Sequence, residues 1–144
     1  MGKRDEQWSR IAAIVGDVKE TTVEEGVERY CKYLQEHLKL PCEVKGIEDF
    51  RWEEFYVLGP GDRAEYKELR KTQPSYSDRY ELLRIEQGEW SEWMLFEEDI
   101  TAFVRRRSDG KEFVLGLSEL EAPRSDPANR QLLDDYSVWL VNSR

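Results

Sequence analysis

Apolar side chains recur at helical intervals between residues 22 and 38. Thr22 and Glu25 have the spacing of a capping box, in which two side chains satisfy the first free amides of a helix. The apolar positions that follow fall on one face of a helix with 3.6 residues per turn. They are Val23, Val27, Tyr30, Cys31, Leu34 and Leu38. The pattern therefore predicts an amphipathic helix over 22–38, ended by the Leu40-Pro41 pair.

Two further helices are predicted at the ends of the chain. Residues 8–15 carry a weaker helical pattern, which Gly16 would end. Near the other end, Asp126 is a candidate N-cap, and Pro127 suits the first helical position, where its missing N–H costs nothing. The apolar residues after it predict a last helix over 127–140.

Short apolar or alternating runs between these helices predict about five strands. The runs are CEVKGI, FYVLGPGD, RYELLRI, ITAFVRRR and KEFVLGL, and RAEYKELRKTQP has the composition of a short surface helix or loop. The turn cluster 108–110 joins the last two strands in a hairpin. Strands joined by tight turns cannot form a parallel βαβ sheet. We therefore expect an α+β fold, a small, strongly bent antiparallel sheet or partial barrel packed with an N-terminal helical region and a C-terminal helix.

Length and composition narrow the class of protein. The 144 residues predict one domain over 1–144, and 39% hydrophobic residues with five Trp are enough for a core. A net charge of −9 opposes binding to nucleic acid or to an anionic membrane, and the run Arg105–Arg107 is read as solvated charges. Two cysteines, no signal-peptide pattern and no apolar run of ~18 residues predict a cytoplasmic protein.

Few residues suit catalysis. His37 is the single histidine, no G-x-S-x-G motif is present, and Cys31 lies on an apolar helix face. Hydrolysis by two carboxylates, as in glycosidases, would need a sugar cleft for which the sequence gives no sign. We therefore expect a protein that is not an enzyme.

Carboxylates are the remaining candidates for chemistry. Oxygen ligands suit Ca2+, but no segment matches the EF-hand loop, so a site would be assembled from separate segments. Helical projection puts Asp135 at the margin of the buried face of the last helix and Asp134 on the far side. The same projection points Glu36 away from its helix core.

Two stretches resemble the CcbP-type calcium-binding proteins of cyanobacteria. They are YCKYLQEHLKLPCEVKGIE and AFVRRRSDGKEFVLGLSELEA continuing to LLDDYSVWLVN, which together cover roughly half of the chain. The resemblance implies a small acidic cytoplasmic protein that binds Ca2+ outside the EF-hand scheme, as a buffer or a signalling sensor. Carried onto this sequence, it implies these metal ligands: Glu36, Asp134 and Asp135, then Glu121, Glu48 and Asp49.

The sequence departs from the family pattern in two places. Residues 51–99 do not align with it and are a possible insertion, and Gln35 is neutral where the family carries an acid. One fewer carboxylate would weaken the attraction for Ca2+.

A second hypothesis is a non-enzymatic protein-interaction module. The segments FRWEEFY and EWSEWMLF place aromatic residues among acids, which suits a basic partner. The aromatic candidates are Trp52, Tyr56, Trp90 and Trp93.

Overall fold

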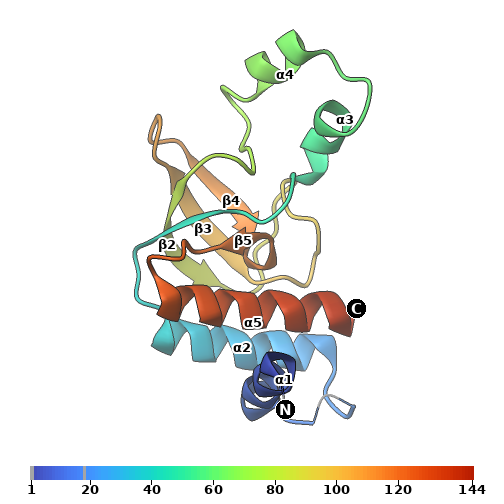
Figure 1. The fold of residues 1–144 in the computed structure, drawn as a ribbon, viewed down its shortest axis with the longest axis vertical. Helices are drawn as coiled ribbons and strands as arrows, with labels where there is room; N and C mark the ends of the chain where they lie inside the picture. Colours follow the sequence, from blue (N-terminus) through green and yellow to red (C-terminus); the bar gives the residue numbers. More distant parts are fainter. Residues whose placement is uncertain (1, 18) are drawn as a thin grey trace.

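The computed structural model describes residues 2–17 and 19–144, and it confirms the predicted helices. Helix α1 spans Lys3–Val15, α2 spans Val23–His37 and α5 spans Pro127–Ser143. Helices α2 and α5 lie side by side along one end of the sheet, and α1 lies against them on the side away from the sheet (Figure 1). None of the helices in the described part of the chain combines the length and the hydrophobicity needed to cross a bilayer.

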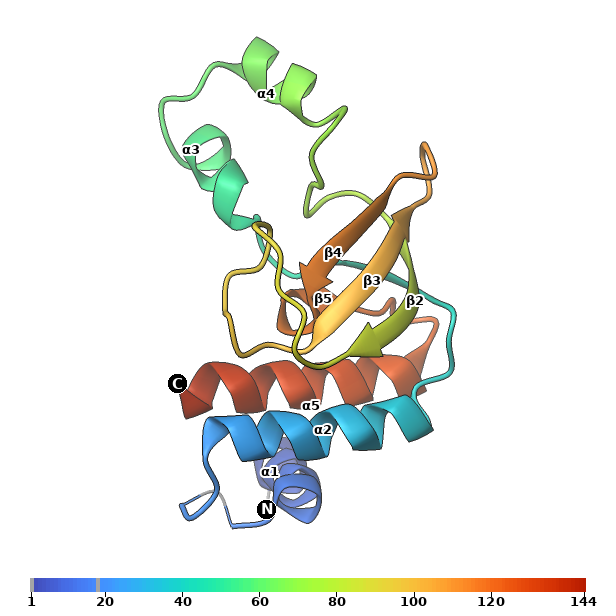
Figure 2. The ribbon, with the colours of Figure 1, turned by 180° about the vertical axis from the view of Figure 1, so that it is seen from behind.

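Five antiparallel strands form a curled half-barrel sheet, which confirms the predicted α+β class (Figure 2). They run in the order β4-β3-β2-β1-β5, with a 3-10 turn, η2 (Leu117–Glu119), before the last strand. Their bounds are β1 Cys42–Gly46, β2 Tyr80–Glu86, β3 Thr101–Arg106, β4 Glu112–Gly116 and β5 Leu120–Glu121. The predicted hairpin is the β3–β4 pair, in which Thr101 is opposite Gly116.

Aromatic packing joins the two central helices. Tyr30 on α2 makes an edge contact with Tyr136 on α5 at 5.2 Å between ring centroids, and Trp139 lies 5.5 Å from Tyr30. Gly26 lets α2 approach this cluster, because a Cβ there would come within 2.1 Å of Trp139. The predicted capping box is present, with the Thr22 hydroxyl accepting from the Glu25 amide. This rigid pair of helices holds the acids of α5 in fixed positions.

The predicted strand FYVLGPGD is wrong. That segment begins inside one helical turn, α3 (Glu54–Val57), which follows a 3-10 turn, η1 (Arg51–Glu53), and precedes the predicted surface helix α4 (Arg63–Leu69). Its apolar side chains Phe55 and Leu58 are exposed, so the run reflects no sheet core. These turns and α4 form a lobe that extends from the sheet on the side opposite the helices (Figures 1 and 2).

Two buried charged side chains anchor this lobe. The Glu53 carboxylate accepts hydrogen bonds from the amides of Phe50 and Tyr76 and from the hydroxyls of Tyr66 and Ser75. Each of the two carboxylate oxygens of this buried acid therefore accepts two hydrogen bonds, which offsets the cost of burying it.

Arg106 is the second anchor, and the expectation that it is a solvated charge is wrong. Its side chain is 3% exposed and pairs with Asp78 at 3.0 Å and Asp109 at 2.7 Å. It also donates to the carbonyl oxygens of Arg70, Lys71 and Gln73. The fixed fork of a guanidinium suits such a junction of loop carbonyls and carboxylates.

Candidate metal centre

Asp135 has the burial predicted for it, but a cation of the protein already neutralises it. Its carboxylate is 5% exposed and accepts from Arg10 Nε at 2.8 Å and Arg10 Nη2 at 3.0 Å. The side-chain amide of Gln7 donates to the same carboxylate at 3.0 Å. Any metal ion at Asp135 would have to displace this two-pronged ion pair between α1 and α5.

Asp134 and Glu121 lie in one groove beside this ion pair. The groove separates α1 from α5 and has a volume of about 580 Å3. Asp134 is exposed and accepts from Gln7 at 2.9 Å, and Glu121 lies 3.8 Å from Arg130 and 4.0 Å from Lys45. We call it the α1/α5 groove, and its lining residues are Lys3, Arg4, Gln7, Arg10, Ile47, Glu121, Arg124, Pro127, Arg130, Gln131 and Asp134. Three of the six predicted ligands are thus brought together, but among five Lys and Arg side chains.

Glu36 is placed apart from the other predicted ligands. It is exposed on α2, as its helical projection predicts, and makes no ion pair with any residue that the structure describes. Its neighbour Gln35 instead donates to the Ile85 carbonyl oxygen of β2 at 3.0 Å. The neutral residue at 35 therefore has a packing role between α2 and the sheet.

Glu48 and Asp49 line a second cavity, on the other side of Ile47. Its volume is about 290 Å3, and it lies between the β1 loop, the η2 turn and the C-terminal half of α5. We call it the Glu119 pocket, and it is lined by Ile47, Glu48, Asp49, Leu95, Phe96, Ser118, Glu119, Ser137 and Val141. No Lys or Arg is among these lining residues. The pocket therefore presents three carboxylates and two hydroxyl groups without a lining cation.

Glu119, which lines this pocket, forms a pair with the buried carboxylate of Asp99, which does not line it. Both lie against Gly116: a Cβ at Gly116 would come within 2.5 Å of Asp99 Oδ2 and 2.8 Å of Glu119 Oε2. Asp99 is buried and accepts from the Ser118 hydroxyl at 2.6 Å and the Tyr136 hydroxyl at 2.7 Å. Glu119 accepts from the Leu95 amide at 3.2 Å. The hydrogen-bond donors to this pair among the described residues are all uncharged groups, and neither acid has an ion-pair partner there.

The electrostatics of the pair follow from this arrangement. Burial raises the pKa of Asp99 to about 6, although the hydrogen bonds from Ser118 and Tyr136 act in the opposite direction. Burial also raises the pKa of Glu119 to about 7, the Leu95 amide lowers it, and the charge of Asp99 raises it further. Two neighbouring acids with raised pKa values are a place where a divalent cation would remove an electrostatic cost.

The donor chemistry of the Glu119 pocket fits a hard cation. Carboxylate and hydroxyl oxygens are the ligands of Ca2+, whereas zinc sites use Cys and His. Among the described residues, no three His, Cys, Asp or Glu side chains converge closely enough to hold a metal ion. The exposed Glu48 and the half-buried Asp49 would therefore have to turn inward to complete a coordination shell with Glu119.

The sequence signal for Asp99 and Glu119 was the apolar residue that directly follows each acid. Asp99 directly precedes the buried Ile100, and Glu119 lies between the buried residues Ser118 and Leu120. Both acids belong to the acidic clusters of the sequence, but neither was among the expected ligands.

The four candidate aromatics for protein binding have different environments. Trp52 donates to the Pro74 carbonyl oxygen at 2.6 Å, and Tyr56 stacks on Tyr66 at 5.4 Å, so both stabilise the lobe. Trp93 packs against the core, whereas Trp90 is 54% exposed. Only Trp90 of the four is strongly exposed.

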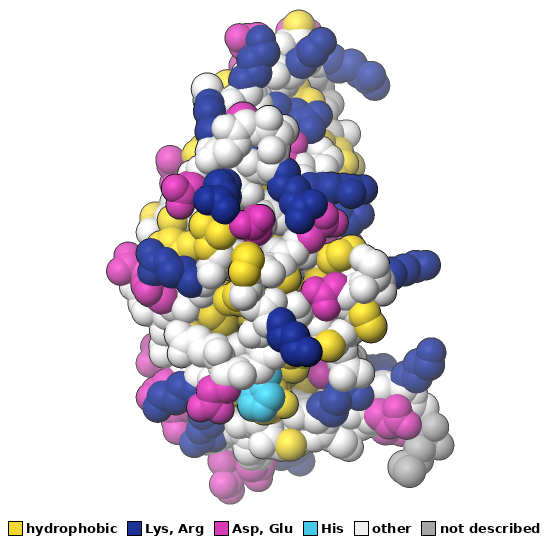
Figure 3. Space-filling model, turned by 90° about the vertical axis from the view of Figure 1, so that its left-hand side faces the viewer, with side chains coloured by type: hydrophobic (Ala, Val, Ile, Leu, Met, Phe, Trp, Pro, Cys, Tyr) yellow, Lys and Arg dark blue, Asp and Glu magenta, His cyan; other side chains and the backbone are white. Residues whose placement is uncertain are grey.

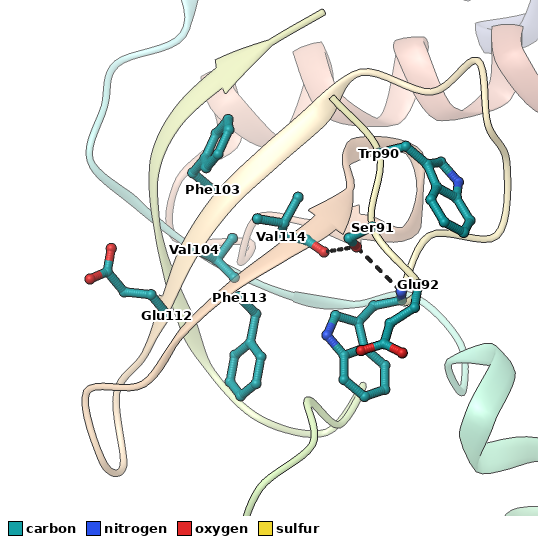
Figure 4. Close-up of a pocket in the computed structure, with 9 residues that line it drawn as sticks. Trp90, Ser91, Glu92, Phe103, Val104, Glu112, Phe113 and Val114 are labelled. Atoms are coloured by element: carbon teal, nitrogen blue, oxygen red, sulfur yellow. Dashed lines mark hydrogen bonds between the residues drawn. The ribbon is translucent and has the colours of Figure 1, made fainter. Parts of the chain in front are cut away.

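Trp90 borders a groove beside the edge strand β4 (Figure 4). The groove has a volume of about 620 Å3, and the Ser91 hydroxyl donates to the Val114 carbonyl oxygen at its wall. We call it the aromatic groove, and its lining residues are Trp90, Ser91, Glu92, Trp93, Phe103, Val104, Glu112, Phe113 and Val114. Its charged lining residues are both acids, which is consistent with the basic partner expected from the sequence.

The remaining reactive groups have structural environments. His37 donates through Nδ1 to the Tyr33 carbonyl oxygen, 2.7 Å away, and stacks on the Tyr33 ring. Cys31 and Cys42 are both buried and free, and burial raises the pKa of each thiol. These thiols are therefore protonated and shielded at neutral pH.

Comparisons with known proteins give the fold but not a family. No protein-family model matches the sequence, and no curated protein sequence matches it. The crystal structure of Anabaena CcbP is similar over 97% of this chain and 93% of its own, with a TM-score of 0.59 and 19% identity. A calcium-binding protein in its calcium-binding form is similar over 99% of this chain and 97% of its own, with the same TM-score and identity. The chain therefore has the fold of these calcium-binding proteins, and the resemblance seen in the sequence is confirmed as a likeness of fold.

Proposed function

We propose that this protein binds Ca2+ in the Glu119 pocket. The observation that carries the proposal is the Asp99–Glu119 carboxylate pair, which lies against Gly116 and has no ion-pair partner within residues 2–17 and 19–144. The fold supports the proposal, because both similar structures are described as calcium-binding proteins. A protein with 31 acidic and 22 basic residues also attracts divalent cations to its surface.

Glu119, Glu48 and Asp49 are the proposed ligands, and Asp99 contributes its charge from behind. Glu119 is anchored by the Leu95 amide, so it offers its other oxygen to the pocket. Ser118 and Ser137 line the same cavity and would add neutral oxygen atoms, with water filling the remaining positions. Of the six ligands that the sequence resemblance implies, this proposal retains Glu48 and Asp49. It leaves out Glu121, Asp134 and Asp135, which already face Lys, Arg or Gln side chains, and the isolated Glu36.

A buffering or sensing role follows from binding, and catalysis is not part of the proposal. The pocket offers few preassembled ligands, and Ca2+ sites with fewer charged ligands and more mobile loops bind more weakly. Binding would draw the loop that carries Glu48 and Asp49 toward η2 and α5. Such a loop movement is how a weak site of this kind would report the presence of Ca2+.

The direct test is calorimetric titration of metal-stripped protein with CaCl2 at pH 7.5. We expect a measurable heat of binding with a one-to-one stoichiometry. The affinity of Glu119→Gln should be at least about tenfold lower, because a charged ligand is lost. Glu48→Gln/Asp49→Asn should weaken binding in the same direction.

Glu121→Gln is the matched control, because Glu121 lies two residues from Glu119 and already faces Arg130 and Lys45. It should leave the affinity within about twofold. No heat and no melting shift at about 5 mM Ca2+ would exclude the function. Loss of binding in Asp134→Asn/Asp135→Asn, with Glu119→Gln unaffected, would instead move the site to α5.

A second candidate function is peptide binding in the aromatic groove. It is favoured by the 54% exposure of Trp90 beside a 620 Å3 cavity whose charged residues, Glu92 and Glu112, are both acids. A basic peptide with an aliphatic or aromatic anchor would match this lining.

The fluorescence anisotropy of a labelled peptide measures this second function. A labelled model peptide of alternating Lys and Leu residues should bind in EDTA with a rise in anisotropy, and Trp90→Ala should abolish the rise. Phe55→Ala is the control, because Phe55 is equally exposed, at 55%, but lies on the lobe. An equal loss in both variants would show adsorption to exposed apolar side chains and would rule out a specific groove.

A further inference from the structure

The α1/α5 groove has the opposite charge balance from the whole protein. Five Lys and Arg side chains and two acids line it, although acids outnumber basic residues in the chain by 31 to 22. Basic and acidic side chains are also interspersed over the face shown in Figure 3, so the net charge does not make a continuous acidic surface on that face. The groove is therefore a local positive site on an acidic protein.

Two acids, Asp135 beside the groove and Glu121 in its lining, hold two of its arginines in place. Asp135 binds Arg10 through Nε and Nη2, and Nη1 of Arg10 has no hydrogen bond to any residue that the structure describes. Arg130 donates through Nη1 to the Ala122 carbonyl oxygen at 2.7 Å, and its Nη2 lies 3.8 Å from Glu121. Both guanidinium groups are thus oriented before any ligand arrives, which lowers the entropic cost of binding an anion.

The other three cations of the groove have no counter-charge. Lys3, Arg4 and Arg124 make no ion pair with any residue in the described part of the chain. Lys3 and Arg4 also lie in the first turn of α1, where the helix dipole disfavours positive charge. An anion between Arg124 and the first turn of α1 would offset this repulsion.

We propose that the α1/α5 groove binds a phosphate-bearing anion with at least two charged groups. Two charged groups are needed because the unpaired cations come from two segments, the start of α1 and the loop before α5. Arginine favours phosphate, because its planar fork donates two parallel hydrogen bonds to one group. The volume of about 580 Å3 suits a small ligand of the size of a nucleotide, and Ile47 and Pro127 provide apolar contacts for an uncharged part.

The test measures anion binding in EDTA, so its outcome does not depend on the proposed Ca2+ site. Sodium pyrophosphate and ATP are titrated into the whole chain in about 50 mM salt, where exposed charges are weakly screened. Vesicles of phosphatidylcholine with phosphatidylglycerol form a second arm, because a lipid headgroup presents the same chemistry. We expect pyrophosphate or ATP to bind, and Arg4→Gln/Arg124→Gln to bind at least about tenfold more weakly, because two unpaired cations are lost.

Arg51→Gln/Arg63→Gln is the matched control for net charge. Both side chains are exposed on the lobe and have no ion pair among the described residues, so the control removes the same charge elsewhere. Binding that survives in the control and is lost in the groove variant supports the site. Binding to vesicles alone identifies the phosphate source as a lipid headgroup. No binding of any probe at about 5 mM, or an equal loss in both double variants, overturns the proposal.

Discussion

The Glu119 pocket and the α1/α5 groove lie on either side of Ile47, and both contain acids that the sequence marks as metal ligands. Beside the groove, Asp135 has Arg10 as an ion-pair partner, and in it Glu121 has Arg130. In the pocket, Glu119 accepts from a backbone amide and lies near a second acid, and it has no ion pair in the described part of the chain. The number of acids is similar in the two places, but the counter-charges are not. A cation site is therefore indicated by uncompensated carboxylates rather than by the density of acids.

The difference gives the two regions opposite energetics. Removing one charge of an ion pair leaves the other charge buried without a partner, which costs a large desolvation free energy. Removing a charge from two neighbouring acids relieves repulsion and desolvation. Charge-neutralising substitutions should therefore destabilise the protein at the groove and stabilise it at the pocket when Ca2+ is absent.

The largest effect is expected from Arg10→Met at the groove. The variant leaves the Asp135 carboxylate, 5% exposed, with one amide donor from Gln7. We expect the free energy of unfolding to fall by about 2–3 kcal/mol, below the cost for a fully buried pair because the Arg10 side chain is 38% exposed. Urea denaturation in EDTA at pH 7.5 measures the change.

A double variant separates charge from packing in this prediction. Arg10→Met/Asp135→Asn should recover part of the loss, because no uncompensated charge remains on α5. A loss below about 0.5 kcal/mol for Arg10→Met alone would show that the pair is as weak as an exposed one and would remove the contrast with the pocket.

The next effect has the opposite sign and depends on pH. Glu119→Gln should raise the free energy of unfolding by about 1–2 kcal/mol in EDTA at pH 8, because Gln cannot take up the charge that the site disfavours. Burial and Asp99 raise the pKa of Glu119 to about 7, and the pKa of Asp99 is raised to about 6. Their unfolded values are about 4, so between pH 4 and pH 7 the folded protein holds more protons than the unfolded chain.

The sign of the pH effect follows from this proton balance. The stabilising contribution of the protonated pair is complete below about pH 4 and is lost as the pH rises through about 6 and 7. The advantage of Glu119→Gln over the natural chain should therefore be near zero at pH 4.5 and largest at pH 8. Glu121→Gln provides the comparison: Glu121 faces two cations, so its substitution should give no stabilisation at either pH. A flat difference between Glu119→Gln and the natural chain would contradict the raised pKa values.

The sequence predicts most of the fold because its signals are local. The Thr22 capping box and the 108–110 turn each specify an element from a few adjacent residues. The prediction of a strand at FYVLGPGD was wrong because its apolar composition does not distinguish a strand from an exposed helical turn. Its conformation depends on tertiary contacts of the lobe, such as the four hydrogen bonds to the neighbouring Glu53, which a local pattern does not contain.

The candidate site is less predictable because counter-charges come from distant positions. Arg10 and Asp135 are separated by 125 residues, so adjacent acids gave no sign of the neutralising arginine. The Asp99–Glu119 pair is nearer to what the sequence can predict. The hairpin register that pairs Thr101 with Gly116 also places Asp99 beside Ser118. Extending the predicted hairpin by two residues would have brought Asp99 and Glu119 together.

The smallest effect is expected at Asp134. It tests whether two acids that are adjacent in the sequence indicate a Ca2+ site in this protein. Asp134→Asn removes an exposed carboxylate whose one hydrogen-bond partner among the described residues is the Gln7 side-chain amide, which can also donate to an Asn oxygen. The free energy of unfolding should change by less than about 0.5 kcal/mol, and the Ca2+ affinity by less than about twofold. Denaturation and titration of this variant, beside Glu119→Gln, compare an acid from an adjacent pair with an acid from a spatial pair. If Asp134→Asn weakened Ca2+ binding more than Glu119→Gln does, the Ca2+ site would lie at the adjacent acids Asp134 and Asp135 of α5. A buried acid without a cationic partner would then be the wrong indicator of the site.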